Sequence, residues 1–444
     1  MKRISILAAC MLLAIAVFAQ TAREEIKADI YKSASNHMAY PGPQKVLTAC
    51  PEGKKPFYIS HYGRHGSRYL CGEMEYGFPL GVLKRAEKSG KLTELGKDVL
   101  RRVELISNEA YKRVGELTPL GAEQHRNIAK RMFERFPEIF ADSANVDAKS
   151  TVVIRCILSM ENALQQLKGM NPKLKIRHDA SNHDMYYMNF GKDWIENRRI
   201  AKDTKVKFNE WKQKHCVPDR LMSVLFNDAS YAKDSIPASP FFSALFKVAS
   251  IIQNQEARHK VTLYDIFTEE EIYNLWEHDN ISWYLGYGGN PQNNGLPPYI
   301  QRNLLRKIIE EADSCMLLEK PGATLRYGHE TMVLPLSFLM ELNNNAVQVT
   351  DLEQITANWQ NYKCFPMAAN IQLVFYRADV NDKDILVKVL FNEDEATLPV
   401  KTDCAPYYHW TDVRQYYLNK LNTFEANMES IKKEAEKKEW DKFW

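Results

Sequence analysis

The stretch PFYISHYGRHGSRYL, residues 56–70, anchors the architecture that we expect for this chain. Its first part, residues 56–61, is short, apolar and rich in strand-forming residues, and the sequence then turns abruptly polar. Such a run is typical of a buried strand that leads into a loop. In open α/β sheets, the loops at the carboxyl ends of strands hold the ligand chemistry. The polar part of the stretch is therefore a candidate functional loop.

This loop places His65 between Arg64 and Arg68, with Gly63 and Gly66 beside it. Planar guanidinium groups match the arrangement of phosphoryl oxygens, and glycine lets the backbone approach a ligand closely. A histidine held between two arginines is placed to attack phosphorus as a nucleophile. A basic surface patch would have the same local sequence, so the loop alone does not decide between the two interpretations.

Five further segments have the composition of short strands, and segments with helical periodicity lie between them. The expected strands are 150–155, 173–178, 323–329, 371–377 and 384–392. Helices are expected within 92–135, after the second strand up to residue 167, over 332–342 and over 410–444. This alternation predicts an α/β core with a central, mainly parallel sheet flanked by helices.

Residues 179–320 differ from the rest because long amphipathic segments with tryptophan and tyrosine replace the strand-like runs. We interpret them as a mostly α-helical insertion, with the α/β core formed by residues 20–178 and 321–444. Trp276, Trp283 and Tyr287 of the insertion are expected in the hydrophobic core. Asp184 is expected to cap a helix.

Three of the expected strands end in ionisable residues, which is the main internal argument for an active site. These ends are Arg64 with His65, Arg155, and His329 with Glu330. Two metal-site alternatives are weaker. His61 and His65 stand four residues apart, but the glycine between them and the strand context disfavour a metal site. His329 and Glu330 begin like the HExxH zinc-protease motif, which fails because residue 333 is valine.

Charge and targeting signals limit the partners and the location of the protein. Lys+Arg (59) nearly balances Asp+Glu (56), so no global basic field indicates nucleic acid or an anionic membrane. Residues 1–19 have the form of an export signal, with a basic start, an apolar run and a small-residue cleavage site at Ala19. The run is shorter than the ~20 residues of a membrane span. We expect an exported protein, periplasmic or secreted, without a stable membrane anchor.

The cysteines argue against a zinc knuckle. Seven remain after residue 19, widely spaced and without a CxxC pair. Their disulfide pairing and the oligomeric state of the chain remain open at this point.

Several motifs together resemble one family. RHGSR at 64–68 resembles the signature of the histidine phosphatase superfamily, in its acid phosphatase and phytase branch. The segments LTPLGAEQH (117–125), STVVIRCILS (150–159) and GHETMVLPLSFL (328–339) are similar to other conserved parts of that branch. Two later segments, MAANIQLVFYR (367–377) and ILVKVLFNEDEATLP (385–399), look most like multiple inositol polyphosphate phosphatases.

The resemblance implies a role for each candidate residue. His65 would be transiently phosphorylated, and Glu330 would protonate the leaving group. Phosphate would be bound by Arg64, Arg68, Arg155 and His329. No metal or other cofactor is implied.

Two departures from the family pattern stand out. Leu70 replaces a common proline, and His329-Glu330-Thr331 replaces the usual His-Ala-Glu. Both possible alignments of the second motif nominate Glu330 as the acid.

The function implied is an exported phosphomonoesterase that acts on inositol polyphosphates such as phytate, at acidic pH because Glu330 must start each cycle protonated. The partner would be a small anionic phosphorylated substrate. A broad acid phosphatase of sugar phosphates and a catalytically silent polyphosphate-binding relative are the alternatives. Basic side chains of or near the insertion are candidates to meet distal phosphates: Arg177, Arg198, Arg199 and Lys202.

Overall fold

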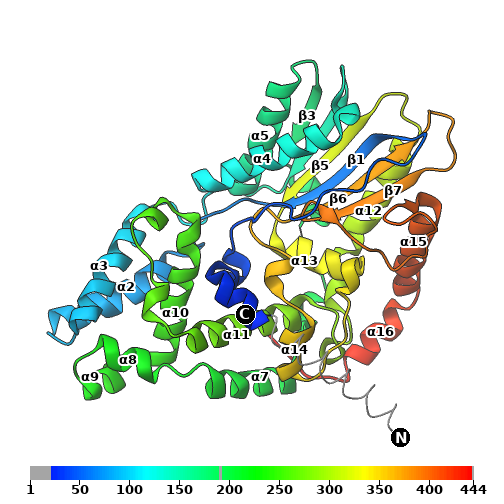
Figure 1. Ribbon diagram of the computed structural model, residues 1–444. Coiled ribbons are helices and arrows are strands. Elements are labelled where there is room, and N and C mark those ends of the chain that lie inside the picture. The colour runs from blue at the N-terminus through cyan, green and yellow to red at the C-terminus, as the bar shows by residue number, and fades with distance from the viewer. Residues whose placement is uncertain (1–21, 190–192, 443–444) are drawn as a thin grey trace, which may run out of the picture.

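The computed structural model describes residues 22–189 and 193–442 (Figure 1). The export signal expected over residues 1–19 lies outside the described residues. Within them, no single helix is long and apolar enough to cross a membrane. One helix pair, residues 229–235 and 238–254, meets that requirement only jointly, and it is bent by 91°.

A mixed sheet forms the centre of the molecule, with the strand order β3-β2-β5-β1-β6-β7-β8. Strands β3, β2, β5 and β1 run parallel, whereas β6, β7 and β8 continue the sheet in antiparallel pairs. The bounds are β1 (Lys55–Arg64), β2 (Asn145–Ser150), β3 (Lys175–Asp179), β5 (Gly322–Gly328), β6 (Asn370–Arg377), β7 (Leu386–Phe391) and β8 (Asp394–Glu395).

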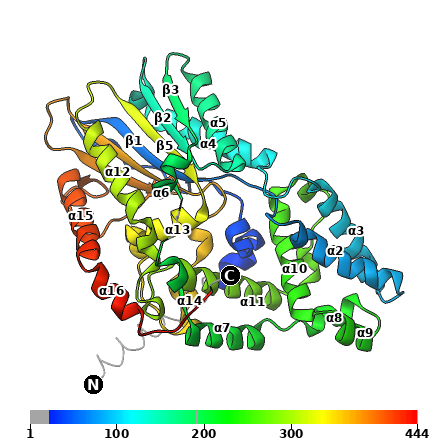
Figure 2. The ribbon, with the colours of Figure 1, turned by 180° about the vertical axis from the view of Figure 1, so that it is seen from behind.

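Helices cover both faces of this sheet, because its central strands are apolar on both sides. Ile59 of β1 packs into the hydrophobic cluster of one face, and Tyr58 and Tyr62 pack into that of the other. The first face carries α4 (Pro119–Arg135) and α5 (Ile154–Met170). The opposite face carries α12 (Arg302–Cys315), α13 (Glu330–Leu339) and α15 (Trp410–Ala426), as Figures 1 and 2 show. This arrangement confirms the predicted α/β class.

A helical layer lies beside the sheet and includes most of the predicted insertion (Figure 1). Its helices from the insertion are α7 (Lys202–His215), α8 (Asp219–Leu225), α9 (Ala229–Ser235), α10 (Ala238–Ile251) and α11 (Glu269–Tyr287). Two earlier helices, α2 (Glu73–Lys88) and α3 (Glu94–Glu109), pack against α10 and α8, respectively. The helical layer therefore draws on residues from both sides of the predicted boundary at 179, and the boundary itself stays a prediction.

The strand expected at 150–155 is wrong in position. Strand β2 is the preceding segment NVDAKS, Asn145–Ser150, and Arg155 lies in the first turn of α5. The β-branched composition of Val152, Val153 and Ile154 misled the interpretation, because Val152 and Ile154 are exposed, 44% and 69% respectively. The chain leaves the sheet after Thr151, whose backbone N–H donates to Tyr327 O (3.0 Å).

Candidate active site

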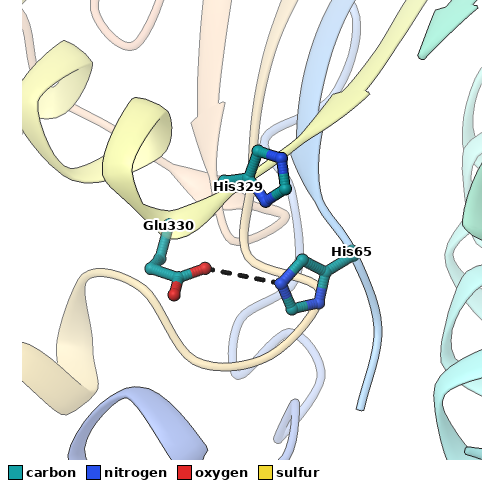
Figure 3. Close-up of side chains that lie close together, drawn as sticks. All are labelled: His65, His329 and Glu330. Carbon is teal, nitrogen blue, oxygen red and sulfur yellow. Dashed lines mark ion pairs between the residues drawn. The ribbon is translucent and has the colours of Figure 1, made fainter. Parts of the chain in front are cut away.

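The ends of two neighbouring strands bring His65 and His329 together. Strands β1 and β5 pair in parallel with Arg64 opposite Gly328, and each histidine follows directly. The backbone N–H of His65 donates to Gly328 O at 2.8 Å. The two imidazole rings lie 5.7 Å apart, edge to face (Figure 3). Pairing of the two strands thus fixes the distance between the two motifs of the sequence.

A backbone contact between two glycines holds the loop after β1. A Cβ atom on Gly66 would lie 2.4 Å from Gly121 O, and one on Gly121 would lie 2.2 Å from Ser67 O. Gly121 is in the first turn of α4, which begins with Thr118 as its N-cap. Thr118 also donates its backbone N–H to Ser67 O at 2.9 Å. The segment LTPLG therefore packs against the His65 loop and holds its backbone in place.

Glu330 faces His65 from the first turn of α13. Its Oε2 atom lies 3.4 Å from His65 Nε2 (Figure 3). The same oxygen lies 3.0 Å from Arg64 Nε. On the other side of the ring, His65 Nδ1 is 2.9 Å from Gly66 O. Because a carbonyl only accepts hydrogen bonds, Nδ1 carries the proton and Nε2 keeps its lone pair. The nucleophilic nitrogen thus points toward the carboxylate.

Three arginines near His65 and Glu330 have N–H groups that are free to donate hydrogen bonds to a ligand. Arg64 donates to Phe365 O (2.7 Å), Arg68 to Tyr69 O (2.9 Å) and Arg155 to Gly115 O (3.4 Å). Arg64 Nη2, Arg68 Nε and Arg155 Nε are buried and have no hydrogen-bond partner among the described residues. Buried donors of this kind are costly unless an acceptor joins them. Their cluster suits an anion with several oxygens.

The surroundings shift the pKa values of the two catalytic candidates. Burial lowers the pKa of His65 well below its usual range, so the imidazole is neutral at physiological pH. Burial alone would raise the pKa of Glu330, but Arg64, His65 and Arg68 hold that pKa well below its usual range. Burial also lowers the pKa of the Arg64 guanidinium to about 10, with Arg68 and Arg155 contributing. The protein thus presents a neutral nucleophile beside an ionised acid.

His329 is neutral as well. Burial, aided by Arg155 and Arg64, lowers the pKa of His329 to about 4. Its Nε2 lies 3.3 Å from Thr151 Oγ1, and the Cys156 thiol packs 3.8 Å from the same atom. The ring is therefore oriented by Thr151, directly after β2, and by Cys156 in the first turn of α5.

His65, His329 and Glu330 also lie close enough together to ligate one metal ion. The positive charges of Arg64, Arg68 and Arg155 oppose a dication at this place, since all three act on His329. The same charges attract an anion. We therefore keep the prediction of a metal-free phosphate site.

The structure brings all six predicted site residues to one region. The arginines lie close enough to act electrostatically on the two rings. Arg64, Arg68 and Arg155 act on His329, and Arg64 and Arg155 act on His65. Arg155 reaches the cluster from a helix, not from a strand end as expected.

The four basic residues considered for distal phosphates make other contacts. Arg177 pairs with Asp147 (2.8 Å), and Lys202 pairs with Glu439 (3.0 Å). Arg198 and Arg199 lie over the rings of Trp194 and Tyr287, respectively. Their role toward a substrate stays a prediction.

Two other predictions, on Asp184 and on three aromatic residues, differ in outcome. Asp184 stands at the N-cap position of α6 (Met185–Met188), but its side chain makes no cap hydrogen bond and instead forms an ion pair with Lys149 (3.3 Å). Trp276, Trp283 and Tyr287 are buried in the hydrophobic core, as expected.

Sequence reasoning missed a buried link between the His65 loop and the helical layer. Ser67 Oγ donates to Asn254 Oδ1 at 2.6 Å, and Asn254 Nδ2 donates to His37 O at 2.7 Å. His37 lies within reach of the charges of Arg68 and Arg64, which help burial to lower its pKa. No local motif marks Asn254 or His37, because their places depend on tertiary packing alone.

Comparisons with known proteins give consistent results. The model of the histidine phosphatase superfamily (branch 2) matches residues 64–392. Multiple inositol polyphosphate phosphatase 1 of Gallus gallus is 21% identical over 415 residues, which cover 87% of this chain and 88% of that protein.

Among solved structures, the multiple inositol polyphosphate phosphatase of Bifidobacterium longum, in complex with inositol hexasulfate, has a TM-score of 0.70 at 18% identity. That match covers 86% of this chain and 97% of that chain. The phytase from D. castellii has a TM-score of 0.65 at 14% identity, covering 88% and 84%, respectively. Both likenesses support the fold class predicted from the sequence.

Proposed function

Because the chain belongs to branch 2 of the histidine phosphatase superfamily, as its motifs indicated, we propose that it hydrolyses phosphate monoesters through a phosphohistidine at His65. The observation that carries this proposal is the buried Nε2 of His65, which faces Glu330 at 3.4 Å within a cluster of arginines. A nucleophile, an acid and anion-binding donors thus stand together, as a double-displacement mechanism requires.

In the first step, His65 Nε2 attacks phosphorus in line, so an N–P bond forms while the P–O bond to the alcohol breaks. Glu330 gives its proton to the departing alkoxide, which is otherwise a poor leaving group. In the second step, Glu330 takes a proton from water, whose oxygen attacks phosphorus and releases phosphate from His65. The free donors of Arg64, Arg68 and Arg155, together with His329, hold the non-bridging oxygens in both steps.

The low pKa of Glu330 in the free protein raises the question of how the acid acquires its proton. A bound phosphate group places negative charge beside Glu330 and competes for the guanidinium of Arg64. Both effects raise the pKa of Glu330 in the complex. A substrate bound as its monoanion also delivers a proton to the site. Acidic pH should therefore favour turnover through the enzyme–substrate complex.

For the substrate, we propose inositol polyphosphates such as phytate. The support is the kind of relative. One multiple inositol polyphosphate phosphatase is similar in sequence over most of its length, and another and a phytase share the fold over most of theirs. The predicted insertion, residues 179–320, would wall the substrate site. We further propose that the protein acts after export, on the basis of its first 19 residues.

A product profile tests the proposal. The purified mature chain, residues 20–444, is given phytate and a set of small phosphate monoesters over pH 3–8. We expect phosphate release from phytate with the highest kcat/KM. Equal efficiency on sugar phosphates would favour a broad acid phosphatase. Capture of phytate without phosphate release would favour a silent binding relative.

The covalent step has a direct test. Brief exposure to radiolabelled substrate and denaturation should leave label on the protein that survives base, as a phosphohistidine does, and His65→Ala should abolish it. Hydrolysis that proceeds without labelled enzyme in single-turnover conditions would contradict the mechanism.

A further inference from the structure

A second group of potential ligands lies far along the chain from His65, at the start of α15. His409 belongs to β9 (Tyr408–His409), which pairs with the beginning of β7. The next residue continues this anchoring, since Trp410 N–H donates to Ile385 O at 2.9 Å. The imidazole is therefore carried by a sheet strand and not by a free loop, which favours precise placement.

Two carboxylates contact the two nitrogens of this ring. His409 Nδ1 lies 2.7 Å from Asp384 Oδ1, and His409 Nε2 lies 3.0 Å from Asp403 Oδ1. The Asp384 carboxylate is itself held, because Lys54 forms an ion pair with its other oxygen (3.3 Å). A histidine whose Nδ1–H donates to a fixed carboxylate presents Nε2 as a ligand, which is how metal-binding histidines are usually oriented.

A thiol completes the group. Cys404 Sγ, a carboxylate oxygen of Asp403 and a ring nitrogen of His409 all lie within 4.8 Å of one another. All cysteines of the described residues are free thiols, so Cys404 is not committed to a disulfide there. A tight turn shapes the segment, because Tyr407 N–H donates to Cys404 O at 2.9 Å. This turn lies between residues 403–404 and His409 and lets their side chains approach one another.

We propose that Asp403, Cys404 and His409 form a zinc site, with Asp384 orienting the histidine and water in the fourth position. Sulfur, imidazole and carboxylate donors in one small group suit a borderline-soft ion such as Zn²⁺, whereas Mg²⁺ and Ca²⁺ prefer all-oxygen sites. The absence of CxxC pairs excludes a zinc knuckle but not this mixed site. The ion would link Asp403 and Cys404 to His409, the last residue of β9 and the N-cap of α15.

The rival explanation is a plain ion pair, in which a protonated His409 bridges Asp384 and Asp403. That arrangement needs no thiol. The involvement of Cys404 therefore separates the two explanations, and the test is built on it.

The test uses the mature chain after treatment with a chelator. Equilibrium dialysis against Zn²⁺ at neutral pH should load one ion per chain, and Co²⁺ should give the near-ultraviolet absorption of a cobalt–thiolate bond. Cys404→Ser should abolish that absorption. His409→Asn should weaken zinc binding at least about 100-fold, and Asp384→Asn by about 10- to 100-fold, as outer partners of metal ligands do.

Matched controls address the other thiols, histidines and ligand groups. Cys50→Ser removes another exposed thiol. His178→Asn removes another histidine–carboxylate pair, since His178 Nδ1 lies 2.6 Å from Glu161 Oε1. His65→Asn disables the only other group of possible ligands found within the described residues. All three should retain one zinc ion and the cobalt absorption.

Two results would overturn the proposal: no stoichiometric zinc uptake by a folded wild-type chain, or uptake that survives both Cys404→Ser and His409→Asn. Circular dichroism of each variant separates loss of the site from loss of the fold. Because the readout is metal content and absorption, the outcome does not depend on the proposed phosphatase function.

Discussion

His65 lies 3.4 Å from Glu330, and His409 lies 2.7 Å from Asp384, yet the two histidine–carboxylate pairs behave oppositely. Burial lowers the pKa of His65, with Arg155 and Arg64 adding to the effect. Hydrogen bonds to Asp384 and Asp403 raise the pKa of His409, whose side chain is partly accessible to solvent. The buried ring is thus neutral and nucleophilic, whereas the surface ring binds a proton more tightly than a free imidazole.

The difference shows that proximity to a carboxylate does not by itself make a histidine basic. At the buried pair, desolvation and the two guanidinium groups of Arg155 and Arg64 outweigh the attraction of one carboxylate. At the surface pair, solvent removes most of the desolvation cost, and the two aspartates prevail. Substitutions at each histidine test this contrast.

The largest effect is expected for His65→Ala. Loss of the nucleophile should reduce kcat by about 10⁴-fold or more, because the remaining groups cannot replace covalent catalysis. Steady-state kinetics on phytate measures the change, and His409→Ala (assayed with chelator present) serves as the surface counterpart that keeps activity. A His65→Ala loss of less than about tenfold would contradict the nucleophilic role.

Glu330→Gln should lower kcat on alkyl phosphates by about 10²–10⁴-fold, the usual contribution of a general acid. The loss should be clearly smaller with 4-nitrophenyl phosphate, whose phenolate leaves without a proton. A kinetic comparison of the two substrates checks this. Equal losses on both would assign Glu330 to binding and not to proton transfer.

A third prediction concerns stability against pH. The folded pKa of His329 is about 4, below its ordinary value of 6.5, so between these values the unfolded chain binds the extra proton. The contribution of His329 is therefore complete above pH 6.5 and is lost as pH falls to about 4, by up to about 3 kcal/mol.

The pH dependence of the His409 contribution to stability has the opposite sign, because the folded pKa of His409 is raised. Its contribution is complete below pH 6.5 and is lost as pH rises through the folded pKa. Urea unfolding from pH 4 to 9, with chelator present, measures the free energy of unfolding as a function of pH. His329→Asn should weaken its pH dependence at acidic pH, and His409→Asn should weaken it near neutral pH. The His409 effect should be the smaller of the two because that side chain is partly exposed, at 32%. Curves that change on the same side would refute the contrast.

The smallest effect concerns the packing that holds the buried pair. Gly121→Ala should lower the free energy of unfolding by about 1–3 kcal/mol, because its Cβ would lie 2.2 Å from Ser67 O. Activity should fall with it as the His65 loop shifts. Gly169→Ala in α5, where a Cβ meets nothing within 4 Å, should be neutral or stabilising by about 0.5–1 kcal/mol. Denaturant titration of both variants decides the comparison.

The sequence predicted those parts of the site whose residues are neighbours in the chain. Arg64, His65 and Arg68 share one loop, and His329 and Glu330 share one turn, so their residue types alone indicated the chemistry. The strand at 150–155 was misplaced because exposed β-branched residues look the same in sequence as buried ones.

The contacts between distant segments were beyond sequence reasoning. The hydrogen bonds of Asn254 to Ser67 and His37 cross the boundary between the sheet and the helical layer. Likewise, Gly66 and Gly121 constrain each other only after α4 has packed beneath the loop. Such contacts follow from tertiary packing and leave no periodic or spaced pattern in the chain.

The register that sets Arg64 beside Gly328 also has a consequence for biosynthesis. A ribosome must complete about three quarters of the polypeptide before the partner strand of β1 exists. Until then His65 has no acid opposite it, because Glu330 follows β5 in the chain. The catalytic pair therefore cannot form before the segment that holds β5 and Glu330 has been synthesised.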